Sequence, residues 1–387
     1  GEQEGSCRRG EAELGGFRVG VGVDFPGRDA EFEILSRNRS KPVGADHGPQ
    51  SVAKTLNGET LAAGRRMVDS IRLDDTILNY IVDLIRATRN DAEIRHGAST
   101  RAADALASAV RAGHSVLVGG GSSLDAVTRT VQQLEDTPFF NAGRGAVFNA
   151  EGRHELDASI MDGSNLDAGA IAGVHNVRNP ILLARRVMTD SVHVMLSGSG
   201  AEAFAREQGL EFADDAYFHT DYRWQQLQDA RAAEASHEAA TRRAHDRWLS
   251  TVGAVALDRA GNLAAATSTG GMTNKRWGRI GDAPIIGAGT YADNRSCAVS
   301  ATGHGEYFIR ATVARDICAR VQFTGVPLRE AAEAVVNGQL RTMGGDGGII
   351  AIDRRGDIAL TFNTPGMYRG RIDVEGDLYV GIYREDD

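Results

Sequence analysis

Hydrophobic and polar positions alternate along the chain in a pattern that predicts helices between hairpins from Ser122 onward. Apolar residues recur every three or four positions after Ser122 and Asp125, which predicts a capped helix with one apolar face formed by Leu124, Val127, Val131 and Leu134. The same spacing predicts helices over 306–323 and 328–340. Each of these helices needs a partner to bury its apolar face.

Strand patterns supply that partner. The segments TVGAVALD and NLAAATST flank a short turn that contains Gly261, and GGIIAID and DIALTF flank one that contains Gly356. A last strand, LYVGIYR, lies near the C-terminus. We therefore expect an α+β fold of two antiparallel sheets with helices outside them.

Two segments differ from the rest of the chain in their pattern of apolar and charged residues. Residues 212–250 form a polar linker, and its run DARAAEASHEAATRRAHDR is read either as a solvated helix or as a mobile linker, exposed in both cases. Before residue 113, the region 68–89 predicts an amphipathic helix with clustered apolar residues, which are Ile77, Leu78, Ile81, Val82, Leu84 and Ile85.

Composition narrows the class of protein. The net charge of −9 argues against nucleic acid as a partner, and no apolar stretch approaches the roughly 18 residues that span a bilayer. Cys7, Cys297 and Cys318 are few, odd in number and far apart, which favours a reducing compartment over a disulfide framework. Without an apolar signal-peptide core near residue 1, we expect a cytoplasmic protein.

Long motifs from about Ala107 to the C-terminus identify a family. They are FFNAGRGAVF, HELDASIMDG, TVGAVALD, TSTGGMTNK, GRIGDAP and TGHGE. Together they resemble the plant-type asparaginase and isoaspartyl peptidase family of N-terminal-nucleophile hydrolases. The resemblance implies a four-layer αββα sandwich, an α-subunit region over 113–250, a β-subunit region over 251–387, and a homodimer of processed heterodimers.

The resemblance makes Thr251 the nucleophile, released when the precursor cleaves itself between Ser250 and Thr251. An N-terminal threonine carries its own general base, because the free α-amine titrates at roughly pH 7.7–8.0 and can accept the hydroxyl proton. Thr269 ends the paired strand of the same hairpin, so we expect its hydroxyl beside that of Thr251. It would then support the nucleophile.

The substrate that the resemblance implies is a small molecule or peptide with a β-aspartyl amide, which presents one carboxylate and one ammonium group. In GRIGD, Arg279 would bind the carboxylate with its planar fork and Asp282 would accept from the ammonium. The remaining matched residues are Thr302 and Gly303 for the oxyanion, Gly305 close to the substrate, and Asn141 holding a water molecule.

Catalysis of this kind needs no cofactor, but the resemblance implies a structural sodium ion bound by backbone carbonyls of the loop 134–148. The implied ligands are Leu134, Glu135, Thr137, Phe140, Ala142 and Arg144.

Two features depart from the family pattern. Ser250 stands where the family has Gly or Asp, so we expect slow or incomplete self-cleavage. The family's first strand and HGGAG-type loop are missing, which would leave ladder hydrogen bonds unpaired. In their place residues 1–112 form a small helical segment in which 17–111 resemble the lid of MoxR-type AAA+ ATPases, with Arg101 at the nucleotide-sensing position but without a phosphate-binding loop.

Two alternatives stay open beside the hydrolase. One is a non-enzymatic adaptor or fusion protein that does not mature. The other is a glycosylasparaginase-like hydrolase, which would share the nucleophile but normally follows the secretory route with disulfides, and the sequence shows neither sign.

Overall fold

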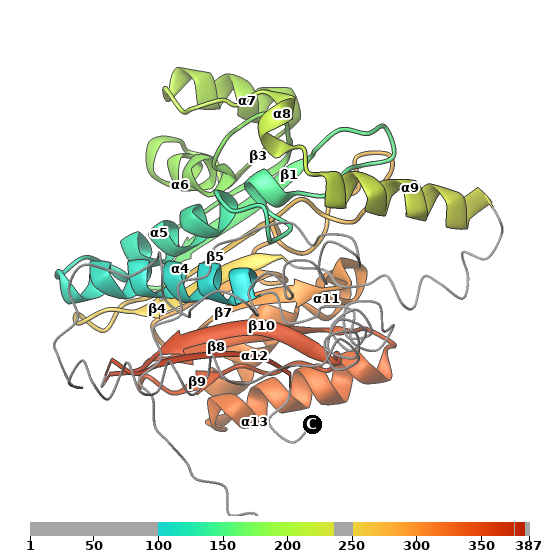
Figure 1. The fold of residues 1–387 in the computed structure, drawn as a ribbon. Helices are drawn as coiled ribbons and strands as arrows, with labels where there is room; N and C mark the ends of the chain where they lie inside the picture. Colours follow the sequence, from blue (N-terminus) through green and yellow to red (C-terminus); the bar gives the residue numbers. More distant parts are fainter. Residues whose placement is uncertain (1–99, 236–250, 375, 384–387) are drawn as a thin grey trace, which may run out of the picture. The chain divides into compact units, whose positions relative to one another are not determined.

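The computed structural model describes residues 100–235, 251–374 and 376–383, and Ala102 begins the compact unit to which nearly all of them belong. Two stacked sheets form its centre (Figure 1). The first has the strand order β3-β2-β1-β5-β4 and the second the order β6-β7-β8-β9. A separate two-stranded ribbon pairs β10 with β11.

The strands of the first sheet are β1 (Leu156–Asp162), β2 (Ala168–Val174), β3 (Met195–Ser197), β4 (Val252–Leu257) and β5 (Leu263–Thr269). Those of the second are β6 (Thr290–Ala292), β7 (Cys297–Gly303), β8 (Gly347–Asp353) and β9 (Ile358–Ala359). The ribbon is β10 (Gly366–Ile372) with β11 (Leu378–Tyr383). All pairs are antiparallel except β2 with β3, so the predicted sheets are confirmed.

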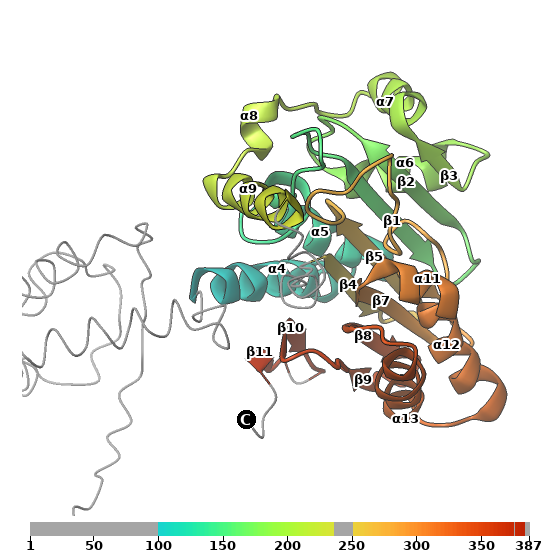
Figure 2. The same cartoon turned by 90° about the vertical axis from the view of Figure 1, so that its right-hand side faces the viewer.

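Helices cover the outer face of each sheet (Figure 2). On the first sheet lie α5 (Ser123–Glu135), α6 (Pro180–Asp190) and α7 (Gly198–Glu207), and on the second lie α12 (Val313–Thr324) and α13 (Leu328–Glu333). The remaining helices are α4 (Thr100–Val118), α8 (Asp215–Phe218), α9 (Asp221–Ala235) and α11 (Gly305–Ala311). This is the four-layer αββα order that we expected.

Local sequence explains these elements well. Ser122 and Asp125 form a reciprocal capping box at the start of α5, as predicted. In the β4–β5 turn the Asp258 carboxylate accepts backbone N–H bonds from Ala260 and Asn262, and Gly261 has φ +82°. Asp353 and Gly356 repeat this arrangement between β8 and β9.

The predicted helix over 306–323 is instead two helices. Thr312 adopts the left-handed conformation between α11 and α12, with φ 46°. The first N–H groups of α12 donate to carbonyls outside the helix, from Ala314 to Ala288 and from Arg315 to Gly287. Anchoring α12 against the segment before β6 therefore compensates the break. The predicted helix over 328–340 is α13 continued by a π-helix, Ala334–Leu340.

The polar linker is only partly described. Its first half contains α8 and α9, in which Arg223, Leu227 and Ala233 are buried. Of the run that we expected to be exposed the structure describes only 229–235, where the expectation is wrong at Ala233. Residues 236–250, including Ser250, lie outside the described residues, as do the predicted helix over 68–89 and nearly all of the lid-like segment.

The first sheet ends at β4 within the described residues. A cavity of about 470 Å³ runs beside this edge, lined by side chains of α4, α5, β4, β8 and β10 such as Leu106, Val127, Ala256, Ile352 and Tyr368. The missing family strand stays a prediction about residues before 100, which the structure does not describe.

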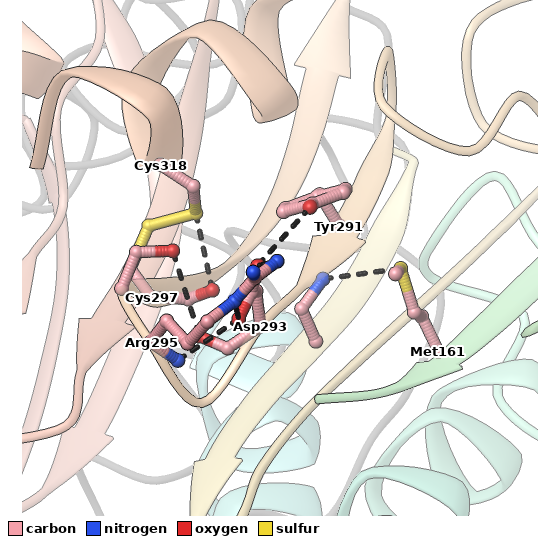
Figure 3. The surroundings of a disulfide bond; sticks show 8 residues. Met161, Tyr291, Asp293, Arg295, Cys297 and Cys318 are labelled. Atoms are coloured by element: carbon pink, nitrogen blue, oxygen red, sulfur yellow. Dashed lines mark hydrogen bonds and ion pairs between the residues drawn. A yellow bond between two sulfur atoms is a disulfide. The ribbon is translucent and has the colours of Figure 1, made fainter. Parts of the chain in front are cut away.

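The prediction that the cysteines stay reduced is wrong for Cys297 and Cys318. Cys297 at the start of β7 and Cys318 in α12 form a disulfide, with their Cα atoms 5.3 Å apart (Figure 3). Packing of α12 on β7 brings together two residues 21 positions apart. The number and spacing of the cysteines carry no information about this packing. The prediction of a cytoplasmic protein therefore loses one of its supports. No described helix is both long enough and apolar enough to cross a membrane.

Candidate active site

The two threonines of the predicted nucleophile hairpin lie side by side. Val252 pairs with Ser268 in the β4–β5 ladder, which places Thr251 opposite Thr269 at the end of the hairpin. The Thr251 hydroxyl donates to the Thr269 hydroxyl at 3.1 Å. Thr269 is buried and Thr251 is half-buried, so the fixed partner of the Thr251 hydroxyl is itself shielded from solvent.

A glycine turn holds the second hydroxyl in place. The backbone N–H of Gly271 donates to Thr269 Oγ1 at 3.1 Å, and the Gly271 carbonyl accepts from Asn141 Nδ2 at 2.7 Å. Asn141 Oδ1 in turn accepts from the backbone N–H of Val147. Asn141 therefore lies close to Thr269, the partner of the predicted nucleophile, and its amide joins this turn to its own loop.

The end of β7 lies at the same end of the molecule as Thr269. The Leu263 N–H donates to Asn294 Oδ1 just before β7, and Thr267 Oγ1 lies 2.7 Å from Ser300 Oγ within it. These two contacts show that β5 and β7 run in the same direction in the stacked sheets. Thr302 and Gly303, which end β7 and pair with Gly348 and Gly347, therefore lie at the same end of the stacked sheets as Thr269, and their oxyanion role stays a prediction.

The predicted substrate-binding pair meets at the start of α11. A Cβ atom at Gly305 would lie 2.8 Å from Arg279 Nη2 and 3.0 Å from Asp282 Oδ1. Only glycine allows α11 to begin this close to both groups. The structure therefore brings Arg279, Asp282 and Gly305 together.

Asp282 is buried, and its Oδ2 atom has no hydrogen-bond partner within the described residues. Burial raises the pKa of Asp282 to about 7, with the nearby Arg279 guanidinium acting in the opposite direction. An ammonium group beside this oxygen would satisfy it and favour its charged form.

Arg279 already holds a carboxylate. Its Nε and Nη2 atoms donate to the two oxygens of Glu306 at 2.9 and 2.8 Å, and His304 Nε2 lies 3.1 Å from Glu306 Oε2. These hydrogen bonds hold the pKa of Glu306 well below its usual range. The guanidinium fork is thus oriented for bidentate carboxylate binding.

Sequence reasoning missed a second charged cluster, formed by Lys275, Glu155 and Asp157. Lys275 Nζ lies 3.2 Å from Glu155 Oε2 and 3.9 Å from Asp157 Oδ2. Burial raises the pKa of Asp157 despite the nearby ammonium, whereas Lys275 and Asn149 lower that of Glu155. All three residues lie inside the motifs HELDASIMDG and TSTGGMTNK, and a carboxylate in an otherwise apolar strand was the available signal.

The predicted sodium loop follows α5. Leu134 and Glu135 end that helix, Arg144 lies in the 3₁₀ turn Gly143–Gly145, and Thr137, Phe140 and Ala142 lie between. A Cβ at Gly143 would lie 2.5 Å from the Glu135 carbonyl oxygen, and one at Gly145 would run into the Phe140 carbonyl. These distances show how tightly the two glycines pack in the loop, and the carbonyls of Leu134, Phe140 and Ala142 already accept backbone hydrogen bonds there, so the sodium site stays a prediction. Within the described residues no cluster of His, Cys, Asp or Glu could hold a metal ion.

Two buried ionisable groups adjoin this loop. The Glu135 carboxyl accepts from the Ile181 N–H at 3.0 Å and from Asn179, and burial raises its pKa to about 8. Arg223 of α9 donates through Nε to the Gly145 carbonyl at 2.9 Å, and burial lowers its pKa. These contacts join α6 and α9 to the loop that carries Asn141.

A family model described as asparaginase matches residues 80–382, beginning inside the segment that we predicted as lid-like. The chain is 52% identical to an isoaspartyl peptidase of Escherichia coli over 285 residues, which cover 73% of this chain and 88% of that protein. An isoaspartyl peptidase of Salmonella typhimurium is 49% identical over 76% of the chain and 95% of its own length.

A vertebrate protein gives the same result. An isoaspartyl peptidase/L-asparaginase of Xenopus laevis is 43% identical over 71% of this chain and 87% of its own length. The matched region includes every described element of the candidate site. The chain therefore belongs to the asparaginase family whose model it matches.

Proposed function

We propose that this protein is a threonine hydrolase that cleaves isoaspartyl peptides and L-asparagine at the β-aspartyl amide and releases L-aspartate. The observation that carries the proposal is the hydrogen bond of 3.1 Å between the Thr251 and Thr269 hydroxyls. Thr302 and Gly303 lie at the same end of the molecule. The same chain also contains the Arg279–Asp282 pair. The relatives that carry the names isoaspartyl peptidase and L-asparaginase support the substrate class.

The reaction begins with self-cleavage between Ser250 and Thr251, which frees the Thr251 α-amine. That amine accepts the hydroxyl proton while Thr251 Oγ1 attacks the amide carbonyl of the substrate. Thr302 and Gly303 stabilise the oxyanion, a contribution on the order of 3–4 kcal/mol per donor. Collapse breaks the C–N bond, the leaving amine takes the proton, and water then hydrolyses the ester to release aspartate.

Substrate orientation depends on the Arg279 and Asp282 pair. Arg279 donates to the α-carboxylate, sharing its fork with Glu306, and the unpaired oxygen of Asp282 accepts from the α-ammonium. Asn141 holds the Gly271 turn and, in the mature enzyme, a water molecule beside it.

Sodium in the loop 134–144 would be structural on this proposal, and catalysis needs no cofactor. Two processed copies assemble as a homodimer of heterodimers in the cytoplasm, without nucleic acid or membrane partners. The part of residues 1–112 that resembles a helical lid takes no part in the chemistry.

Mass spectrometry and an activity assay test the proposal together. Purified protein should convert from the intact 41.2 kDa chain to two fragments, one of which begins at Thr251, and should then release ammonia from L-asparagine. Thr251→Ala should abolish both. Cleaved protein that hydrolyses neither asparagine nor β-aspartyl dipeptides would favour the non-enzymatic adaptor instead.

The Cys297–Cys318 disulfide weakens one of the two arguments against a glycosylasparaginase-like activity. A glycosylated asparagine substrate distinguishes that alternative, since the proposed enzyme should leave it intact while cleaving β-aspartyl dipeptides.

A further inference from the structure

The ammonium group of Lys275 is buried between carboxylates behind the proposed nucleophile. Its side chain is only 2% exposed, and it lies 3.2 Å from Glu155 Oε2 and 3.9 Å from Asp157 Oδ2. It also donates to the Glu155 carbonyl at 3.4 Å. A buried charge is costly unless it is paired, so this cluster has a specific reason to be enclosed.

Lys275 also adjoins the glycine turn that orients Thr269. Gly271 has φ +79°, and a Cβ atom there would lie 2.9 Å from Lys275 Nζ. The same glycine donates its N–H to Thr269 Oγ1. The Lys275 backbone is fixed in turn, because its carbonyl accepts from the Ala150 N–H at 2.8 Å. The ammonium is therefore one residue removed from the hydroxyl pair.

Asp157 shares a row of the sheet with the two threonines. It is the cross-strand partner of Thr269 in the β1–β5 ladder, and Thr251 stands opposite Thr269 on the other side. Neighbouring strands lie roughly 4.8 Å apart, so Asp157 is about 10 Å from Thr251 on the same face. At this distance the charge of the cluster acts on the Thr251 α-amine, partly screened because Thr251 is half-buried.

We propose that Lys275 is a positioning residue for the Thr251 nucleophile, which packs against the Gly271 turn and cancels the carboxylate charge behind the α-amine. The assignment rests on the proposed function. Glu155 and Asp157 would otherwise stabilise the protonated α-ammonium, which cannot act as a base. The lysine thus keeps the amine available near neutral pH.

Other charged groups face this cluster without replacing the lysine. Arg279 acts on Asp157, Asp282 interacts with Asp157, and His175 acts on Glu155. Arg279 is committed to Glu306 and to the substrate carboxylate. Lys275 alone among the described cations contacts both carboxylates.

The acid limb of the kcat–pH profile tests the proposal, because it reports the pKa of the Thr251 α-amine in the substrate complex. Asp282 is already paired with the substrate in that complex and does not contribute to the limb. With matured wild-type protein as reference, Lys275→Met should move the limb upward by about one pH unit. It leaves a carboxylate charge about 10 Å from the α-amine uncompensated, and one charge at this distance has this effect at an effective dielectric constant of about 20. Glu155→Gln should move it downward, and the double variant should return it towards the wild-type position.

Two further variants complete the experiment. Lys275→Arg keeps the charge and should leave the limb within about 0.3 pH unit. Arg276→Met, one residue along, removes an exposed cation that pairs with Glu234 and should not move it. Opposite shifts in two single variants cannot arise from general misfolding, and Glu155→Gln retains the test if Lys275→Met accumulates poorly.

The possible failures are distinguishable. Wild-type protein that matures but hydrolyses no β-aspartyl amide overturns the proposed function and this assignment with it. An active wild type whose Lys275→Met and Glu155→Gln variants keep the same limb, or shift in the same direction, overturns the role of Lys275 alone.

Discussion

Two groups of charged residues lie near Thr251 and Thr269, and each consists of one cation with its carboxylates. They differ in how far their side chains are exposed to solvent. At one, the Arg279 side chain is 18% exposed and its partner Glu306 is 48% exposed. At the other, Lys275 is 2% exposed and Asp157 is fully buried. A partly exposed cation can bind a second carboxylate at little cost, whereas a buried pair cannot be separated without leaving an unpaired charge. The first therefore suits a carboxylate that arrives with each turnover, and the second suits a fixed framework.

The largest expected effect is a loss of catalytic efficiency when the more exposed cluster loses its cation. Arg279→Ala should lower kcat/KM for L-asparagine by about 10²–10⁴-fold, because two charge-assisted hydrogen bonds are each worth roughly 1.5–3 kcal/mol. Thermal stability should change little. Steady-state assays and melting curves of the same preparation check this, and an unchanged KM would remove Arg279 from the binding site.

In the buried cluster, we expect loss of the cation to change stability substantially. Lys275→Met should lower the free energy of unfolding by about 3 kcal/mol, because it leaves Glu155 and Asp157 in the interior without their cation. Arg276→Met is the matched control and should stay within about 0.5 kcal/mol. Urea unfolding measures both, and equal losses would erase the distinction between buried and exposed cations.

Asp282 lies beside the first cluster but is buried, so its binding role should depend on pH. Burial raises its pKa to about 7, and only the ionised form attracts the substrate ammonium. KM should therefore rise as pH falls below 7, by up to about tenfold per unit. Asp282→Asn should have a higher KM without this dependence, and a wild-type KM that stays constant from pH 5.5 to 8 would contradict the role.

The smallest effect belongs to Glu306. Glu306→Gln removes one partner of a half-exposed pair, which is worth about 0–1 kcal/mol, and the guanidinium becomes freer to bind substrate. We expect KM to change by less than about fivefold. A loss comparable to that of Arg279→Ala would show that Glu306 fixes the fork in place.

Much of the fold follows from local pattern. The capping box at Ser122 and the two turns at Gly261 and Gly356 are local signals, because each is formed by residues within a few positions of one another. The break at Thr312 was not predictable in this way. An apolar face continues through it, and only the contacts of α12 with Gly287 and Ala288 compensate for the lost helical turn.

The residues of the candidate site also divide into those that local sequence places together and those that it does not. Thr251 with Thr269, and Arg279 with Asp282, are close in sequence or joined by one hairpin, so motif spacing placed them correctly. Lys275 with Asp157 spans two distant motifs and was missed. Their association depends on the pairing of β1 with β5, which no local period encodes.

The sequence by itself determined the family motifs, the hairpin that presents Thr251 and the residues that match substrate binding, because these depend on short-range spacing and side-chain chemistry. Only the tertiary structure decided that Cys297 bonds to Cys318, that β5 and β7 run in the same direction, and that Lys275 is enclosed between carboxylates. The physical reason is the same in each case. These contacts join strands and helices from separate layers, and their free energy exists only once the layers pack.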